Sequence, residues 1–182
     1  ERVLPHLSWL RFTVAAGTPD RYADIMYKGP QHTEVFDNAI KNIKYAVDYK
    51  KKHNLSVTLG IQMVLMPEFA DEIIPFAKLG VDLGVDYAII KHCSDDEHGT
   101  LGIDYSLYES MFDLIRQAES MSNDTTQVIA KWDKIKDKGK ASYKRFYGPP
   151  ISFADKWQWF SCTFWYVFSS YPFKTPYWKF HY

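Results

Sequence analysis

The chain has 182 residues, enough for one domain with a buried core. Its 22 basic and 22 acidic residues give zero formal net charge, which provides no electrostatic argument for a nucleic-acid or anionic-membrane partner, and we expect neither. No run of about 18 apolar residues is present to span a membrane. Two cysteines, Cys93 and Cys162, are too few for a secreted disulfide framework, so we expect a cytoplasmic protein.

The N-terminal third begins with a strand and a long helix. Residues 7–16 are apolar and β-branched, which predicts a buried strand that stops at the turn-forming residues 17–20. Thr33 is predicted to cap a helix over residues 33–52, with Glu34 in its first turn. The apolar face of this helix is expected to comprise Val35, Phe36, Ile40, Ile43 and Val47.

Three further strands alternate with two further helices. The strands are predicted at residues 56–66, 85–92 and 126–132. One helix is predicted at 69–83, with Pro75 in or near its first turn and an end near Gly84. The other is predicted at 105–121, with an inward face made of Leu107, Met111, Leu114 and Ile115. Apolar strands separated by helices indicate an α/β fold with a parallel sheet, either doubly wound or part of a β/α barrel.

The composition changes near residue 150, which divides the chain into an α/β unit (1–150) and a tail (151–182). Between residues 156 and 182, 13 of 27 residues are aromatic, with no helix or strand period. Tryptophan has a single codon, TGG, whose last two bases begin a glycine codon in the neighbouring frame. We therefore expect the tail to be a frameshift product that packs poorly. An authentic aromatic binding surface or a membrane-lying segment is the alternative.

Three segments, in this order, resemble the later half of the radical S-adenosylmethionine (radical SAM) core domain, in members with a C-terminal SPASM-like extension. They are SWLRFTVAAGTPDRYADI (8–25), FDNAIKNIKYAVDYKKKHNLSVTLGIQMVLMPEFADEI (36–73) and LGVDYAIIKHCSDDE (83–97). The resemblance covers residues 2–150 and implies a partial, TIM-like parallel β/α barrel. It also implies that the parent enzyme cleaves SAM reductively at a 4Fe-4S cluster to generate a 5′-deoxyadenosyl radical, and acts on a small-molecule or peptide substrate.

The family's cluster motif, C-x-x-x-C-x-x-C, is absent from this chain. Its thiolates hold three irons of the cluster, and two scattered cysteines cannot replace them. We therefore expect a fragment that begins after the cluster motif and that is inactive by itself.

The resemblance also suggests which residues form the site, because barrel enzymes place their chemistry at the carboxyl ends of the strands. Thr13 matches the family's serine that contacts the methionyl part of SAM, although Ala15 stands where the family often has aspartate. The other cofactor-binding residues that we assign are Gln62, Val64 and Ile90. Lys91 and His92 are assigned to substrate binding.

Other interpretations remain open for this region. His92, Cys93, Asp95, Asp96 and His98 are ligand types for zinc, but their spacing fits no closed zinc site, so no metal site is predicted. A non-catalytic α/β module could bind a ligand in the same strand-end crevice. A metal-independent barrel enzyme could use Lys91 through a Schiff base.

Overall fold

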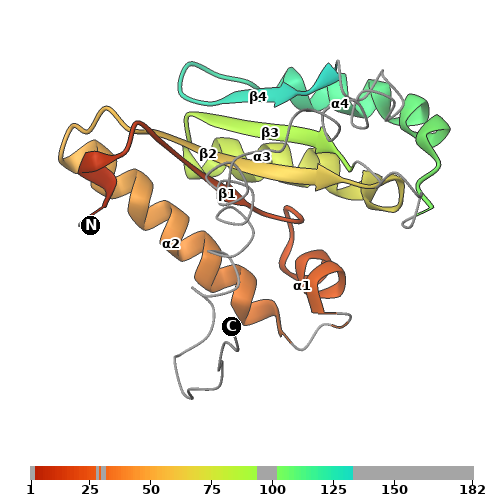
Figure 1. Ribbon diagram of the computed structural model, residues 1–182, viewed down its shortest axis with the longest axis horizontal. Coiled ribbons are helices and arrows are strands. Elements are labelled where there is room, and N and C mark those ends of the chain that lie inside the picture. The colour runs from red at the N-terminus through yellow and green to blue at the C-terminus, as the bar shows by residue number, and fades with distance from the viewer. Residues whose placement is uncertain (1–2, 28, 30–31, 94–101, 133–182) are drawn as a thin grey trace, which may run out of the picture.

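The computed structural model describes residues 3–27, 29, 32–93 and 102–132. These residues form a four-stranded parallel sheet flanked by helices (Figure 1), which confirms the predicted α/β class. The strands are β1 (Trp9–Thr13), β2 (Thr58–Leu65), β3 (Tyr87–His92) and β4 (Gln127–Ala130). They follow one another across the sheet in chain order, and each lies within a range that the sequence predicts.

Helices connect the strands. They are α1 (Pro19–Tyr27), α2 (Thr33–Lys52), α3 (Ile73–Leu83) and α4 (Phe112–Glu119), with short 3-10 helices η1 (Leu4–His6), η3 (Pro67–Glu72) and η4 (Tyr105–Met111). Crossovers between parallel strands are right-handed, so a sheet whose strands lie in chain order carries its connecting helices on one face. As predicted, Pro75 lies in the first turn of α3, and Gly84 ends that helix with a left-handed φ of 66°.

Three helix starts differ from the prediction. The helix expected at 69–83 begins at Ile73, because Pro67–Glu72 form the 3-10 helix η3. Residues 17–20 were expected to form only a turn, yet α1 begins at Pro19, whose fixed φ and missing N–H suit the first position of a helix. The N-cap of α2 is His32 rather than Thr33, and its side chain makes no capping hydrogen bond. Thr33 is therefore the first helical residue.

The predicted helix over 105–121 divides into η4 and α4, and half of its expected inward face is wrong. Leu107 and Leu114 are 48% and 38% exposed. A 3-10 segment has three residues per turn instead of 3.6, which shifts the phase of the buried side. The buried residues of the pair are Tyr108, Met111, Ile115 and Ala118.

The core lies between the helices and one face of the sheet. On that face the side chains of Leu59, Ile61, Met63, Leu65 and Ile90 are at most 1% exposed. Helix α3 approaches closely, because a Cβ on Gly80 would lie 2.7 Å from the Ala88 Cβ of β3. Helix α2 buries Phe36, Ile43, Ala46 and Val47, in agreement with most of its predicted apolar face.

The basic end of α2 has a structural role at the amino ends of the strands. The Lys50 ammonium donates to both carboxylate oxygens of Asp86 at 2.6 Å. The same carboxylate accepts the backbone N–H of Leu59 at 2.6 Å. This network attaches the C-terminal end of α2 to the amino ends of the strands, whereas the candidate site lies at their carboxyl ends.

The predicted tail, 151–182, lies outside the described residues. None of the helices described is long and apolar enough to cross a bilayer.

Candidate functional site

Four of the predicted site residues share one face of the sheet. In the sheet register Thr13 lies beside Gln62, and Val64 lies beside Lys91. Neighbouring positions in a parallel sheet point to the same side, about 4.8 Å apart. All four side chains are half-buried, whereas the β2 residues between them are fully buried on the helix side. We call the face that carries Thr13, Gln62, Val64 and Lys91 the site face.

The site face offers polar groups near the carboxyl ends of β1, β2 and β3. The side chains of Thr13 and Gln62 form no hydrogen bond with any other described residue. A hydroxyl and an amide can each donate and accept, so both can serve a polar ligand. The Lys91 ammonium supplies a positive charge one row closer to the strand ends. The combination suits a ligand that has a carboxylate or an amine.

Ile90 and His92 lie on the other side of the sheet. Ile90 is 0% exposed and His92 is 1% exposed, among the helices. The His92 ring packs against Tyr105 and edge-on against Tyr108, with ring centroids 6.1 Å and 5.8 Å away. The sheet therefore separates these two predicted site residues from the four on the site face.

A buried carboxylate holds the loop that follows β1, next to Thr13. Glu72 is 3% exposed, and its oxygens accept hydrogen bonds from the Gly17 N–H at 2.6 Å, the Thr18 N–H at 3.1 Å and the Thr18 hydroxyl at 2.8 Å. Gly17 also lies directly against α3, because a Cβ there would be 2.2 Å from the carbonyl carbon of Pro75. Sequence reasoning missed this contact, since a single glutamate in a helical segment carries no periodic signal.

An ion pair joins α1 to η3 beside this loop. The Arg21 guanidinium donates to both oxygens of Asp71 at 2.8 Å and 3.0 Å, and to Asp24 at 2.9 Å. It also lies 5.6 Å from the ring centroid of Phe69. The hydrogen bond from Arg21 lowers the pKa of Asp71, and the same bond raises the pKa of Arg21. Together with Glu72, this pair fixes the segment that follows β2 against the segment that follows β1.

Tyr108 packs on the helix side of the sheet, at the carboxyl end of β2. Its hydroxyl donates to the Leu65 carbonyl at 2.7 Å, and that carbonyl also accepts the Cys93 N–H at 2.8 Å. Burial raises the pKa of the Tyr108 hydroxyl well above its usual value of 10.0. The hydroxyl is therefore a neutral structural donor at physiological pH.

The described residues do not form a metal-binding site. They contain no group of three or more His, Cys, Asp and Glu side chains placed to hold a metal ion. Cys93 is the one cysteine among them. Three of the residues considered for zinc, Asp95, Asp96 and His98, lie outside the described part of the chain. The described residues do not fit a 4Fe-4S cluster, which needs several thiolates.

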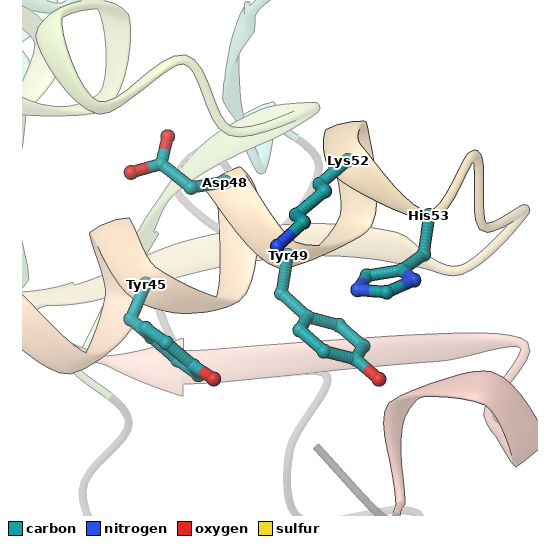
Figure 2. Close-up of a pocket in the computed structure, with 5 residues that line it drawn as sticks. All are labelled: Tyr45, Asp48, Tyr49, Lys52 and His53. Carbon is teal, nitrogen blue, oxygen red and sulfur yellow. The ribbon is translucent and has the colours of Figure 1, made fainter.

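A second feature lies on the outer side of α2, away from the strand ends. An open hollow of about 380 Å³ is lined by Tyr45, Asp48, Tyr49, Lys52 and His53, whose side chains are drawn in Figure 2. Three rings form a row along the helix, with centroids 6.2 Å apart for Tyr45 and Tyr49, and 4.2 Å apart for Tyr49 and His53. We call Tyr45, Tyr49 and His53 the aromatic row. Four of the five lining residues belong to α2 and His53 follows it directly, so a single helical segment lines the hollow and does not enclose a ligand.

Comparison with known proteins does not assign the chain to a family. No protein-family model matches the chain, and no curated protein is significantly similar to it.

Proposed function

We propose that the chain is the later part of a radical SAM core domain, an incomplete TIM-like barrel whose site face contributes to SAM and substrate binding. In this proposal Thr13, Gln62 and Val64 contact SAM, and Lys91 contacts a carboxylate of the substrate or of SAM. Ile90 and His92 lie behind these positions, on the helix side. The protein would be cytoplasmic and inactive by itself.

The arrangement of the strands supports the barrel part of the proposal. The four parallel strands lie in chain order, as they do in a β/α barrel, whereas a doubly wound sheet reverses its order at a switch point. In a barrel the face without helices is the interior, and the site face occupies that position.

The observation that carries the proposal is the pair of neighbouring rows on the site face, Thr13 beside Gln62 and Val64 beside Lys91. The methionyl part of SAM has a carboxylate and an amine, which suit the Lys91 ammonium and the Thr13 and Gln62 side chains. The apolar Val64 can contact the adenosine part. When bound to a reduced cluster, SAM supplies the radical that abstracts hydrogen. The described residues themselves do not fit a cluster.

A SAM titration of the whole chain by isothermal calorimetry tests the site. We expect Gln62→Leu to weaken SAM binding by about tenfold, the effect of one lost hydrogen bond to a charged or polar group. Gln127→Leu is the matched control, because it makes the same change on the same face at the amino end of the sheet. Equal weakening by both substitutions, or no binding of SAM to the unmodified chain, would contradict the proposal.

Sequencing of the gene on both sides of this reading frame tests the family assignment separately. We expect a C-x-x-x-C-x-x-C motif upstream and a one-base shift near codon 151. A clean start codon with no upstream cysteine motif would remove the radical SAM assignment.

A non-catalytic α/β binding module is the second candidate. It is favoured by one observation, that the site face has polar groups while the described residues lack a cluster's ligands. This candidate predicts a ligand that binds at Gln62 and Lys91 and leaves unchanged. A ligand other than SAM whose binding is lost in Gln62→Leu and retained in Gln127→Leu would favour it.

A further inference from the structure

One edge of the sheet is closed by its own chain. Alternate residues of a strand in a parallel sheet turn their backbone N–H and C=O groups to opposite sides. Lys131 donates its N–H to β3, so Val128 and Ala130 turn theirs to the outer edge of β4. The hydroxyl of Ser122 accepts the Val128 N–H at 3.0 Å, and the Glu119 carboxylate accepts the Ala130 N–H at 2.9 Å. Another strand cannot pair with β4 unless these side chains leave.

The closure of β4 is reinforced by a packed tryptophan. The Glu119 carboxylate also accepts the indole N–H of Trp132, at 3.1 Å and 2.9 Å from its two oxygens. The Trp132 ring meets Phe112 edge-on, with centroids 5.4 Å apart. The carboxylate is therefore held in place over the edge.

At the opposite edge, β1, no described residue makes such a closure. Ser8 and Val14 form hydrogen bonds with β2, so the backbone groups of Trp9, Arg11 and Thr13 turn outward. No described residue forms a hydrogen bond with these outward groups. The Trp9 side chain at this edge is 51% exposed. An edge of this kind is a template for another strand.

The side chains of β1 on the helix side are also incompletely covered. Leu10 and Phe12 are half-buried, whereas their neighbours in β2, Leu59 and Ile61, are 1% and 0% exposed. A strand added to β1 would cover both apolar side chains.

The sequence of β1 is complementary to itself in an antiparallel register centred on Leu10. With Leu10 opposite the partner's Leu10, the outward groups of Trp9 and Arg11 face each other across the two-fold axis. This register places Arg11 beside the partner's Trp9, a cation–π pair of the kind that Arg11 already makes with Trp9 in its own strand at 5.7 Å. A register centred on Arg11 would instead bring two like charges opposite each other. We propose that β1 pairs in this Leu10-centred register with β1 of a second copy, giving a two-fold dimer with one continuous sheet.

The aromatic row of α2 fits the same dimer. A two-fold axis that relates antiparallel neighbours is perpendicular to the sheet, so the helices of both copies lie on the same side. Lys51 approaches Gly84 at the end of α3, at 3.2 Å from the position of a Cβ there. At about 100° per residue, Tyr45 and Tyr49 lie on the flank of α2 away from Lys51. Figure 2 shows Tyr45, Tyr49 and His53 projecting together from the helix, and Tyr45 is 49% exposed. The dimer brings this flank toward α2 of the partner.

The small size of the interface sets its strength. A five-residue strand and one helix flank form a contact at the lower end of specific interfaces, which associate weakly and reversibly. Dimerisation is therefore expected at micromolar concentrations. This inference concerns the chain as given and does not depend on SAM binding. In the barrel of the proposed function a strand that precedes β1 would occupy the same edge, so that strand and the dimer exclude each other.

Sedimentation velocity of the whole chain, from about 5 to 500 µM, tests the dimer. We expect a monomer–dimer equilibrium for the unmodified chain. Trp9→Arg places an arginine opposite the partner's Arg11 and should raise the dissociation constant at least about tenfold. The double variant Trp9→Arg with Arg11→Glu restores an opposite-charge pair in the same register and should restore the dimer.

Far-UV circular dichroism of each variant confirms that the fold is retained, since both side chains lie at an exposed edge. A chain that stays monomeric over the whole range would overturn the proposal. So would association that is unchanged in Trp9→Arg, or aggregation without a dimer, because either result places the contact elsewhere. Failure of the double variant to recover would reject the Leu10-centred register.

Discussion

The carboxylate of Glu72 accepts a 2.6 Å hydrogen bond from the backbone N–H of Gly17, although 55 residues separate the two in the chain. With the two bonds from Thr18, this contact holds the loop after β1 against the segment after β2. A buried carboxylate is stabilised only where hydrogen bonds replace its hydration, and three donors do so here.

Removal of the Glu72 carboxylate should destabilise the fold. Glu72→Leu leaves two partly buried N–H groups and a hydroxyl without their acceptor, so we expect a loss of about 2–4 kcal/mol in the free energy of unfolding. Glu72→Gln keeps an acceptor and should lose less. Glu68→Leu, at an exposed position of the same 3-10 helix, should change stability by less than about 0.5 kcal/mol. Urea unfolding measures all three, and equal effects at both positions would contradict the role of Glu72.

Substitution by alanine should reduce the stability of the fold by different amounts at two glycines. A Cβ on Gly17 would meet the backbone of Pro75 at 2.2 Å, whereas a Cβ on Gly60 would meet the Tyr87 ring at 2.1 Å. A ring can rotate and a backbone carbonyl cannot, so Gly17→Ala should cost about 3 kcal/mol or more and Gly60→Ala about 1–2 kcal/mol. In a double-mutant cycle, Tyr87→Ala should relieve the cost at Gly60 and leave that at Gly17 unchanged.

Tyr108 should make stability fall at high pH. Its pKa is raised in the folded state by burial, so the folded protein keeps a proton that the unfolded chain loses above pH 10. The contribution of this group is therefore fully present below pH 10 and is lost progressively as the pH rises above that value. Tyr108→Phe should lower stability at pH 7 by about 0.5–1.5 kcal/mol and should flatten the alkaline fall. An unchanged alkaline slope in that variant would contradict the assignment.

The pair of Arg21 and Asp71 should contribute little at neutral pH. Their side chains are 32% and 55% exposed, so solvent screening limits the pair to about 0.2–1 kcal/mol. Because the pKa of Asp71 is lowered in the folded state, this contribution is present above the unfolded pKa of 3.8 and is lost as the pH falls through the lower folded value. Thermal unfolding of Asp71→Asn at pH 7 and at pH 2.5, with and without 1 M salt, should show a larger difference from the unmodified chain at pH 7 and low salt than under the other conditions.

Local physics accounts for the elements that the sequence predicts correctly. Helix α2 spans the predicted 33–52, since a 20-residue amphipathic pattern reports its own buried face. Helix α1 was missed because Gly17 and Pro19 are both turn-forming residues, and the loop they begin is fixed by Glu72, a residue far along the chain. The prediction placed the wrong residues of η4 on its buried side, because the 3-10 geometry of this segment depends on packing that no local pattern encodes.

The sequence by itself determined four buried parallel strands, the helices between them and the polar positions near the strand ends, because periodicity and turn residues act over short distances. Tertiary structure alone decided which face of each strand the helices cover. Strands that are apolar on both sides, such as residues 85–92, carry no sign of this choice. Consecutive residues must point to opposite faces, so Ile90 and His92 pack under the helices while Lys91 joins Thr13 and Gln62 on the site face.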